Sequence, residues 1–103
     1  MQVVARRTLR EFWQRHPQAE GPMRAWLALV SKQRWASTHE IKKVFGATVD
    51  FVGDNRVIFD IGGNKFRLIV HVSFKLGRAL IKFIGTHKEY DRIDPETVSW
   101  RKK

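Results

Sequence analysis

The spacing of apolar residues changes once along this chain, near Gly46, and this change limits the folds open to it. Before Gly46, apolar side chains recur every three or four residues, which is typical of one face of a helix. After it they alternate with polar side chains, which is typical of a half-buried β-strand. Helices followed by strands predict an α+β fold, with N-terminal helices packed on one face of a small antiparallel β-sheet.

The first half of the chain predicts three helices. The first runs from Thr8, which pairs with Glu11 in a capping-box pattern, to His16 before Pro17. A second helix begins near Pro22, a residue favoured in the first turn. Each of these helices places one tryptophan, Trp13 or Trp26, among apolar residues at helical spacing, which favours burial in the core over stacking on bases. His16, at the C-terminus of the first helix, is favoured there by the helix dipole, so its position does not indicate a bound ligand.

The third predicted helix follows a second capping-box pattern, Ser37 to Glu40, and ends at Gly46. Lys42 and Lys43 lie on its polar side, away from its apolar residues. Contact with a phosphate backbone would explain two lysines at this position. A solvated helix face explains them equally well, so both interpretations stay open.

The second half predicts strands separated by tight turns at residues 53–55, 62–64 and 76–78. Consecutive strands joined in this way form an antiparallel meander. The expected strands are residues 50–52, 56–61, 66–74 and 79–84, with a short strand at 2–5 joining their sheet.

The longest predicted strand has two different faces. Its apolar face, expected under the helices, carries Phe66, Leu68, Val70 and Val72. Its other face carries Arg67, Ile69, His71 and Ser73. Beyond this sheet a short helix is expected after Asp94, and Trp100 is the one tryptophan considered for base stacking.

Composition limits the classes of function. A chain of 103 residues with 43% hydrophobic residues predicts one domain over residues 1–103. The absence of cysteine excludes disulfides, thiolate catalysis and Cys-based zinc sites, and the four histidines show no spacing typical of metal ligands. No segment approaches the roughly 20 apolar residues that a membrane span needs. We therefore expect a cytoplasmic protein without a metal or cofactor.

Positive charge is the strongest global feature of the sequence. Its 20 Lys and Arg against 10 Asp and Glu leave a formal net charge of +10. The segment from Ile61 through Lys88 contains no acidic residue, although Lys and Arg recur along it. A field of one sign favours a polyanionic partner. A membrane surface fits less well, because these cations lie in strand-like sequence and not along an amphipathic helix.

The segment from Gly85 to Asp91 gathers an imidazole, an ammonium, a phenol and two carboxylates directly after a strand. A strand end holds such side chains in one geometry, and this set suits acid and base chemistry on a phosphate. His87 is the natural acid or base, because imidazole gains and loses a proton near neutral pH. A polar exit from a strand, with solvated charges, explains the same residues.

Arg67 lies in the middle of the longest predicted strand, where an arginine needs an explanation. An ion pair with Asp60 across the hairpin provides one. A phosphate clamp provides another, because a guanidinium binds phosphate through two parallel hydrogen bonds. The two roles do not exclude each other.

Two motifs, in this order, resemble the HigB toxins of bacterial toxin–antitoxin systems: Gly62-Gly63-Asn64-Lys65-Phe66-Arg67-Leu68 and, after a hairpin, Thr86-His87-Lys88-Glu89-Tyr90-Asp91-Arg92-Ile93-Asp94. These toxins belong to the RelE-like group of small basic mRNA interferases, and the resemblance covers nearly the whole chain. It implies RNA bound on the concave sheet face and cleavage of mRNA, often on the translating ribosome. It also implies neutralisation by a helix-turn-helix antitoxin, HigA.

Within this resemblance, four residues are expected to be catalytic: Arg67, His87, Lys88 and Tyr90. Arg67 would hold the phosphate as charge develops, and Lys88 would do the same or orient the substrate. Tyr90 would donate a proton, bind the phosphate or stack on a base. Contacts with RNA are expected from Lys42, Lys43, Arg56, Asn64, Lys65, His71, Lys82 and Arg92.

Two classes of function remain open: a metal-independent endoribonuclease toxin, and a non-catalytic module that binds RNA or the ribosome through the same basic sheet. His87 separates them, because only the enzyme requires it. Some RelE-like relatives carry lysines on the strand before the hairpin, where this chain has Arg56, Ile58 and Asp60. The general base therefore stays open, as do the codon or base that is cut and the place where the antitoxin binds.

Overall fold

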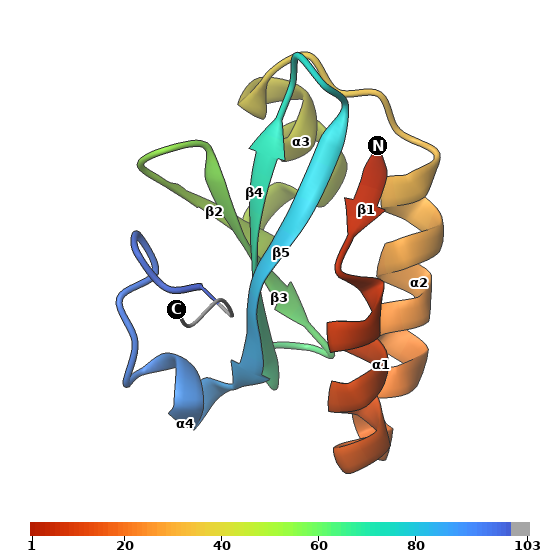
Figure 1. The fold of residues 1–103 in the computed structure, drawn as a ribbon, viewed down its shortest axis with the longest axis vertical. Coiled ribbons are helices and arrows are strands. Elements are labelled where there is room, and N and C mark those ends of the chain that lie inside the picture. The colour runs from red at the N-terminus through yellow and green to blue at the C-terminus, as the bar shows by residue number, and fades with distance from the viewer. Residues whose placement is uncertain (100–103) are drawn as a thin grey trace.

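The computed structural model describes residues 1–99 of the chain, so Trp100 lies outside the described residues. Helices occupy the first half and most of the sheet lies in the second, as the spacing of apolar residues predicted (Figure 1). The elements are, in order, β1 (Gln2–Val4), α1 (Arg6–Arg15), the 3-10 helix η1 (Pro17–Ala19), α2 (Glu20–Ser31), α3 (Thr38–Phe45), the 3-10 helix η2 (Gly46–Thr48), β2 (Val49–Val52), β3 (Arg56–Ile61), β4 (Phe66–Ser73), β5 (Arg78–Thr86) and α4 (His87–Tyr90).

Within residues 1–99, five strands form one sheet in the order β1-β5-β4-β3-β2. The four strands from β2 to β5 are antiparallel neighbours, which confirms the predicted meander. β1 instead runs parallel to β5 and pairs Val3 with Ala79, so the sheet is mixed where an antiparallel one was expected. A parallel pair needs a long connection, and the helical half of the chain together with the meander provides it.

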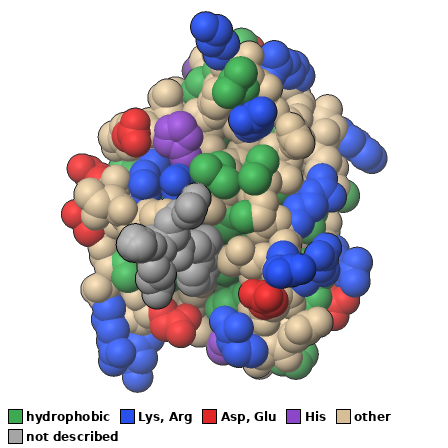
Figure 2. All heavy atoms as spheres, viewed as in Figure 1, with side chains coloured by type: hydrophobic (Ala, Val, Ile, Leu, Met, Phe, Trp, Pro, Cys, Tyr) green, Lys and Arg blue, Asp and Glu red, His purple; other side chains and the backbone are tan. Residues whose placement is uncertain are grey.

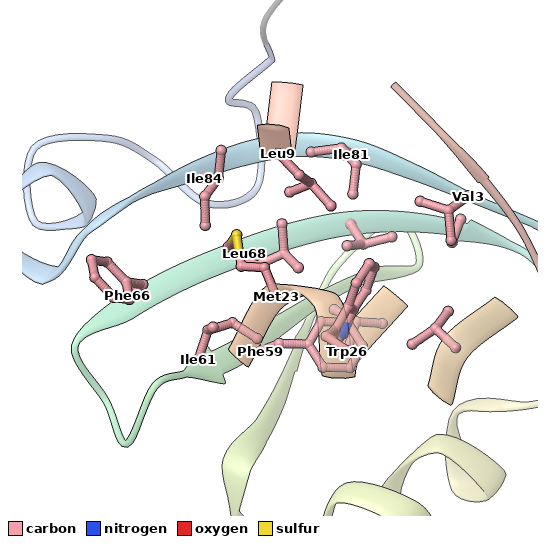
Figure 3. Close-up of a cluster of buried hydrophobic side chains, with 14 of the residues drawn as sticks. Val3, Leu9, Met23, Trp26, Phe59, Ile61, Phe66, Leu68, Ile81 and Ile84 are labelled. Atoms are coloured by element: carbon pink, nitrogen blue, oxygen red, sulfur yellow. The ribbon is translucent and has the colours of Figure 1, made fainter. Parts of the chain in front are cut away.

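One face of the sheet is covered by α1 and α2, which lie side by side in Figure 1. Figure 3 shows Leu9 of α1 and Met23 of α2 pointing into the same cluster as Leu68 of β4. All three side chains are fully buried. Trp26 packs edge-on against Phe59, with ring centroids 5.3 Å apart, so the tryptophan belongs to the core as predicted. Phe66, Leu68, Val70 and Val72 all face this layer, as expected.

The opposite face of the sheet carries a smaller apolar cluster, built from Ile58, Ile69 and Phe83. Tyr90, Ile93 and Val98 pack against it. The chain that follows β5 therefore folds back over the face that the helices leave uncovered. Part of this face stays open, and the polar side chains of β4 emerge there.

A turn replaces the helix that was expected after Asp94. The backbone N–H groups of Thr97 and Val98 donate to the Asp94 carbonyl, at 3.1 Å and 2.9 Å. Arg56 of β3 donates through Nη1 to the carbonyls of Pro95 (3.2 Å) and Val98 (2.6 Å). These carbonyls accept from a side chain of the sheet, whereas in a helix they would accept from the backbone amides of the next turn.

The two predicted capping boxes had different outcomes. α1 begins at Arg6, after Ala5 in the left-handed region (φ 75°), so the prediction that Thr8 caps this helix was wrong. The reason is that the chain leaves β1 and turns into the helix earlier than the pattern indicates. Ser37 does occupy the N-cap of α3 and Gly46 its C-cap, which confirms those bounds. The predicted box itself is not formed, because the Ser37 side chain makes no capping hydrogen bond and Glu40 accepts from the backbone N–H of Ala36. Among the described helices, none combines the length and apolar content that crossing a bilayer requires.

Candidate functional site

The candidate site lies on the open face of the sheet, where β4, β5 and the first turn of α4 meet. Arg67 of β4 lies opposite Gly85 of β5 in the strand register, and α4 begins two residues later at His87. The backbone N–H of His87 also donates to the Lys65 carbonyl, at 3.3 Å. The segment Gly62–Lys65, which we call the hairpin tip, is therefore tied to the start of α4.

A capping box fixes the orientation of α4. Thr86 Oγ1 accepts from the backbone N–H of Glu89 at 3.2 Å, and Glu89 Oε1 accepts from the backbone N–H of Thr86 at 2.8 Å. His87 is the first residue of the helix that this box starts. The sequence interpretation as a strand-to-turn exit missed the helix, although the Thr-x-x-Glu pattern that signals a capping box was present at Thr86 to Glu89.

Gly85 makes room for this capping box. A Cβ atom at residue 85 would lie 2.6 Å from Cζ of Phe83 and 2.9 Å from Oε1 of Glu89. Both distances are shorter than carbon and oxygen atoms accept without movement. A side chain at this position would therefore push Glu89 away from the Thr86 amide or displace the Phe83 ring from its cluster. Nothing in the spacing of the sequence pointed to this glycine.

Arg67 contacts three other side chains of the site. It forms an ion pair with Asp60, which confirms the predicted pairing across the hairpin. Its Nη2 lies 3.0 Å from Nε2 of His87, and its guanidinium carbon lies 5.4 Å from the centroid of the Tyr90 ring. About 15% of the Arg67 side chain is exposed, so the guanidinium is mostly enclosed by these contacts.

The contact with Arg67 determines which nitrogen of His87 carries the proton. A guanidinium has five donors and no acceptor, so Nε2 of His87 accepts in this arrangement. The proton of the neutral ring is then on Nδ1, which lies 3.6 Å from Oδ2 of Asp91, one turn further along. Asp91 therefore lies beside the imidazole at a distance slightly longer than a hydrogen bond, a proximity that the sequence alone did not indicate. An unprotonated Nε2 can accept a further proton.

The four residues expected to be catalytic occupy two neighbouring places. Arg67, His87 and Tyr90 contact one another, with the His87 and Tyr90 rings 6.3 Å apart. Lys88 is exposed beside His87 and faces a hollow that it shares with Lys65 of the hairpin tip. It therefore lies next to the central group without joining it.

The residues expected to contact RNA divide between the two sides of the molecule. His71 lies on the same face of β4 as Arg67, and Lys82 lies at the bulge opposite Ile69 and Val70. Asn64 and Lys65 are exposed on the hairpin tip, and Arg92 is exposed after α4. These five positions surround or continue the central group.

Three of the residues expected to contact RNA lie elsewhere. Lys42 and Lys43 are exposed on α3, whose Ile41 is buried in the core on the helix side of the sheet. Arg56 is only 6% exposed and donates to two backbone carbonyls. It holds the C-terminal segment against the sheet, and little of its side chain is exposed to a ligand.

The site itself holds both signs of charge, since Asp60 pairs with Arg67 and Asp91 lies beside His87. On the face of the molecule in Figure 2, Lys and Arg side chains are more widespread than Asp and Glu. Among the described residues, no three His, Cys, Asp or Glu side chains are grouped as ligands of a metal ion would be. What the site offers instead is a cationic donor, an imidazole nitrogen whose lone pair accepts from that donor, and a phenol.

Comparison with known proteins gives the chain clear relatives. The model of the HigB toxin family, described as a RelE-like toxic component of a toxin-antitoxin system, matches residues 19–93. The mRNA interferase toxin HigB of Escherichia coli K12 is 27% identical over 92 residues, covering 88% of each chain. An mRNA interferase HigB of Shigella flexneri matches to the same extent, and one of Escherichia coli O6:H1 is 22% identical over 94 residues. The family match includes both Arg67 and His87.

Proposed function

This chain belongs to the HigB family of RelE-like toxins, the toxic components of toxin–antitoxin systems, and from that premise we propose that it is a metal-independent endoribonuclease that cleaves mRNA and stops translation. Relatives that match over most of their length carry the name mRNA interferase. The protein acts in the cytoplasm on mRNA held by the ribosome. Its cognate antitoxin is a HigA-like protein with a helix-turn-helix domain.

The observation that carries the proposal is the contact between Arg67 and His87 on the open face of the sheet. Cleavage of RNA without a metal uses the 2′-hydroxyl as the nucleophile. The enzyme must take the proton of that hydroxyl, stabilise the extra negative charge at phosphorus and protonate the leaving 5′-oxygen. A guanidinium and an unprotonated imidazole nitrogen at one place supply the first two of these.

In the proposed mechanism, Arg67 binds the non-bridging oxygens of the scissile phosphate. The phosphate then takes the place of the imidazole as an acceptor for Nη2. His87 Nε2 is thereby released beside the substrate and accepts the proton of the 2′-hydroxyl. The new bond joins the 2′-oxygen to phosphorus as the bond to the 5′-oxygen breaks, which leaves a 2′,3′-cyclic phosphate and a 5′-hydroxyl.

The leaving 5′-oxygen needs a proton, which we assign to the phenol of Tyr90, whose ring centroid lies 6.3 Å from that of His87. Lys88, the residue after His87, orients the substrate. Tyr90 is placed by its packing against the apolar cluster of the open face and by Arg67 over its ring. The proposed RNA surface consists of Asn64, Lys65, His71, Lys82 and Arg92. These residues hold the strand on either side of the scissile phosphate.

The test of this function is cleavage of a synthetic mRNA by purified protein, with analysis of the new ends. We expect cyclic phosphate and 5′-hydroxyl ends, because water is not the nucleophile. On free RNA the reaction survives EDTA. Ribosomes loaded with mRNA need magnesium, so EDTA cannot be added to them. There the end groups of the products are the only evidence for the mechanism. His87→Gln lowers the rate by about 10²–10⁴-fold, the usual contribution of a general acid or base.

His39→Gln is the matched control, because His39 is exposed at the start of α3 in the helix layer. It cleaves at the rate of the wild-type protein. RNA that stays intact both free and on programmed ribosomes, while the protein still binds it, would refute the enzyme and leave the non-catalytic binding module. Ends carrying a 5′-phosphate would refute the mechanism.

A further inference from the structure

A hollow of about 470 Å³ opens beside His87, between the C-terminal end of α1 and the hairpin tip. Arg15 and His16 line it from the helix, Lys65 and Phe66 from the hairpin, and His87 and Lys88 from α4. His87 is thus shared between the hollow and the candidate site. An RNA chain that leaves the site past His87 would enter the hollow directly.

The hollow is a cationic surface without counter-ions. Arg15, Lys65 and Lys88 line it, and no carboxylate does. Within residues 1–99, none of these three cations forms an ion pair, whereas Arg24 and Arg67 each have a carboxylate partner. The Arg15 guanidinium contacts only a backbone carbonyl of its own helix, that of Glu11 at 3.4 Å, and the Phe12 ring at 5.8 Å. Its charge is therefore available to an anion.

The hollow also presents an aromatic, polar edge. The His16 ring stacks on Phe12, with centroids 4.4 Å apart and planes inclined by 27°, and leans against Phe66 at 6.1 Å. This packing fixes the ring while leaving His16 partly exposed. Its side chain has no hydrogen-bond partner among the described residues. A planar ring held at the wall with unused polar atoms suits a nucleobase, which stacks and hydrogen-bonds.

We propose that this hollow is a subsite for the nucleotide next to the scissile phosphate, in which Arg15 and Lys88 bind the flanking phosphate and His16 contacts the base. The proposal rests on the proposed RNA-cleaving function, and adds a second binding site from α1. The hollow's size lies in the range of about 300–1,000 Å³ of common ligand sites. An acidic peptide would use the same cations, but it would leave the ring of His16 without a role.

The test combines binding and cleavage for Arg15→Ala, His16→Ala and the control Arg10→Ala. Arg10 is exposed on the same helix and does not line the hollow. Binding is measured by fluorescence anisotropy with a short single-stranded RNA that carries 2′-deoxyribose at the cleaved position. Arg15→Ala weakens binding about fivefold or more near physiological salt and lowers the slope of log K against log salt by roughly 0.7. Arg10→Ala changes neither quantity.

Cleavage separates a subsite from a structural role. We expect Arg15→Ala and His16→Ala to raise KM for an RNA that extends past the cut on both sides, with kcat nearly unchanged. For a dinucleotide substrate, which lacks the flanking phosphate, Arg15→Ala and the wild-type protein perform alike. Melting temperatures within about 2 °C of the wild type show that the fold is intact, since surface substitutions are usually near neutral.

Each failure has its own signature. Equal binding of the long RNA by Arg15→Ala and wild type overturns the subsite and leaves the cleavage mechanism standing. Absence of cleavage by every variant, with the binding defect still present, overturns the proposed function and not the hollow as an RNA site. If an acidic peptide of matched charge binds as tightly as the RNA and displaces it, the nucleotide assignment is wrong.

Discussion

Arg67 makes the ion pair that the sequence predicted and also contacts a second side chain of the candidate site. Its ion pair with Asp60 satisfies part of the guanidinium within the sheet, and its contact with His87 reaches into the candidate site. The first contact holds the side chain in place before any substrate arrives. Preorganised donors of this kind stabilise developing charge at little cost during the reaction.

Replacement of Arg67 should therefore test whether this side chain stabilises the charge that develops on the phosphate during cleavage. Arg67→Ala is expected to lower the single-turnover cleavage rate by about 10²–10³-fold, the cost of losing a preorganised donor to the transition state. Arg67→Lys recovers only part, because an ammonium lacks the planar fork. Arg78→Ala, at the exposed start of β5, serves as the control. A wild-type rate for Arg67→Ala would exclude this residue from catalysis.

Gly85 is a second residue whose identity the site requires. We expect Gly85→Ala to destabilise the fold by about 1–3 kcal/mol, as overpacking does, because its Cβ meets Phe83 and Glu89. Urea unfolding measures the change, and the cleavage rate should fall with it. Gly21→Ala is the matched control, since no atom lies within 4 Å of a Cβ there. Equal stability of Gly85→Ala and wild type would contradict the steric account.

At the residue scale, types of side chain were predictable and their distances were not. Arg67, His87 and Tyr90 are chemically distinctive, and alternation along a strand places Arg67 on the polar face. The importance of Asp91 and Gly85 depends on which residues lie beside them in the folded protein. Asp91 matters because one helical turn brings it to His87, and Gly85 because Glu89 folds back over it. Neither relation exists until the chain is folded.

At the scale of elements, α4 is the part on which the site depends most. It is only four residues long, so its stability comes from its capping box and its contacts with the sheet, not from helix propensity. It was not predicted because four residues show no apolar periodicity. The capping-box pattern at Thr8 misled in the opposite way. It lies inside α1, which begins two residues earlier at Arg6, and so does not mark a helix start.

Loss of the capping box should weaken α4 locally. Thr86→Ala removes the acceptor for the Glu89 amide and is expected to destabilise the helix start by about 1 kcal/mol. Hydrogen exchange at the Glu89 amide should accelerate, and cleavage should slow because His87 loses its fixed position. Thr86→Ser keeps the hydroxyl and should behave like the wild type. Unchanged exchange in Thr86→Ala would show that tertiary contacts alone hold α4.

At the scale of the whole molecule, the sheet separates two tasks. The helices bury its larger apolar face, and the chain after β5 closes part of the other face beside the site. Apolar periodicity predicted the first layer, because both helices and strands carry a repeating pattern. The second layer depends on Arg56 reaching across to residues about forty positions away, a pairing that no local pattern contains.

Arg56 should accordingly behave as a structural residue. Arg56→Ala leaves the carbonyls of Pro95 and Val98 without their charged donor and is expected to cost about 2 kcal/mol or more of unfolding free energy. Arg78→Ala, which removes an exposed charge, should stay within about 0.5 kcal/mol of the wild type. Chemical denaturation measures both. If Arg56→Ala keeps its stability and loses salt-dependent RNA binding, the residue belongs to the RNA surface after all.

The order of β4, β5 and α4 along the chain has a consequence for biosynthesis. A ribosome adds Arg67 well before His87, because α4 follows β5 along the chain. A nascent chain that ends within β5 thus carries the Arg67 guanidinium without the His87 imidazole that contacts it in the folded site. The message that encodes the protein is therefore not exposed to a working nuclease until translation has passed its last strand.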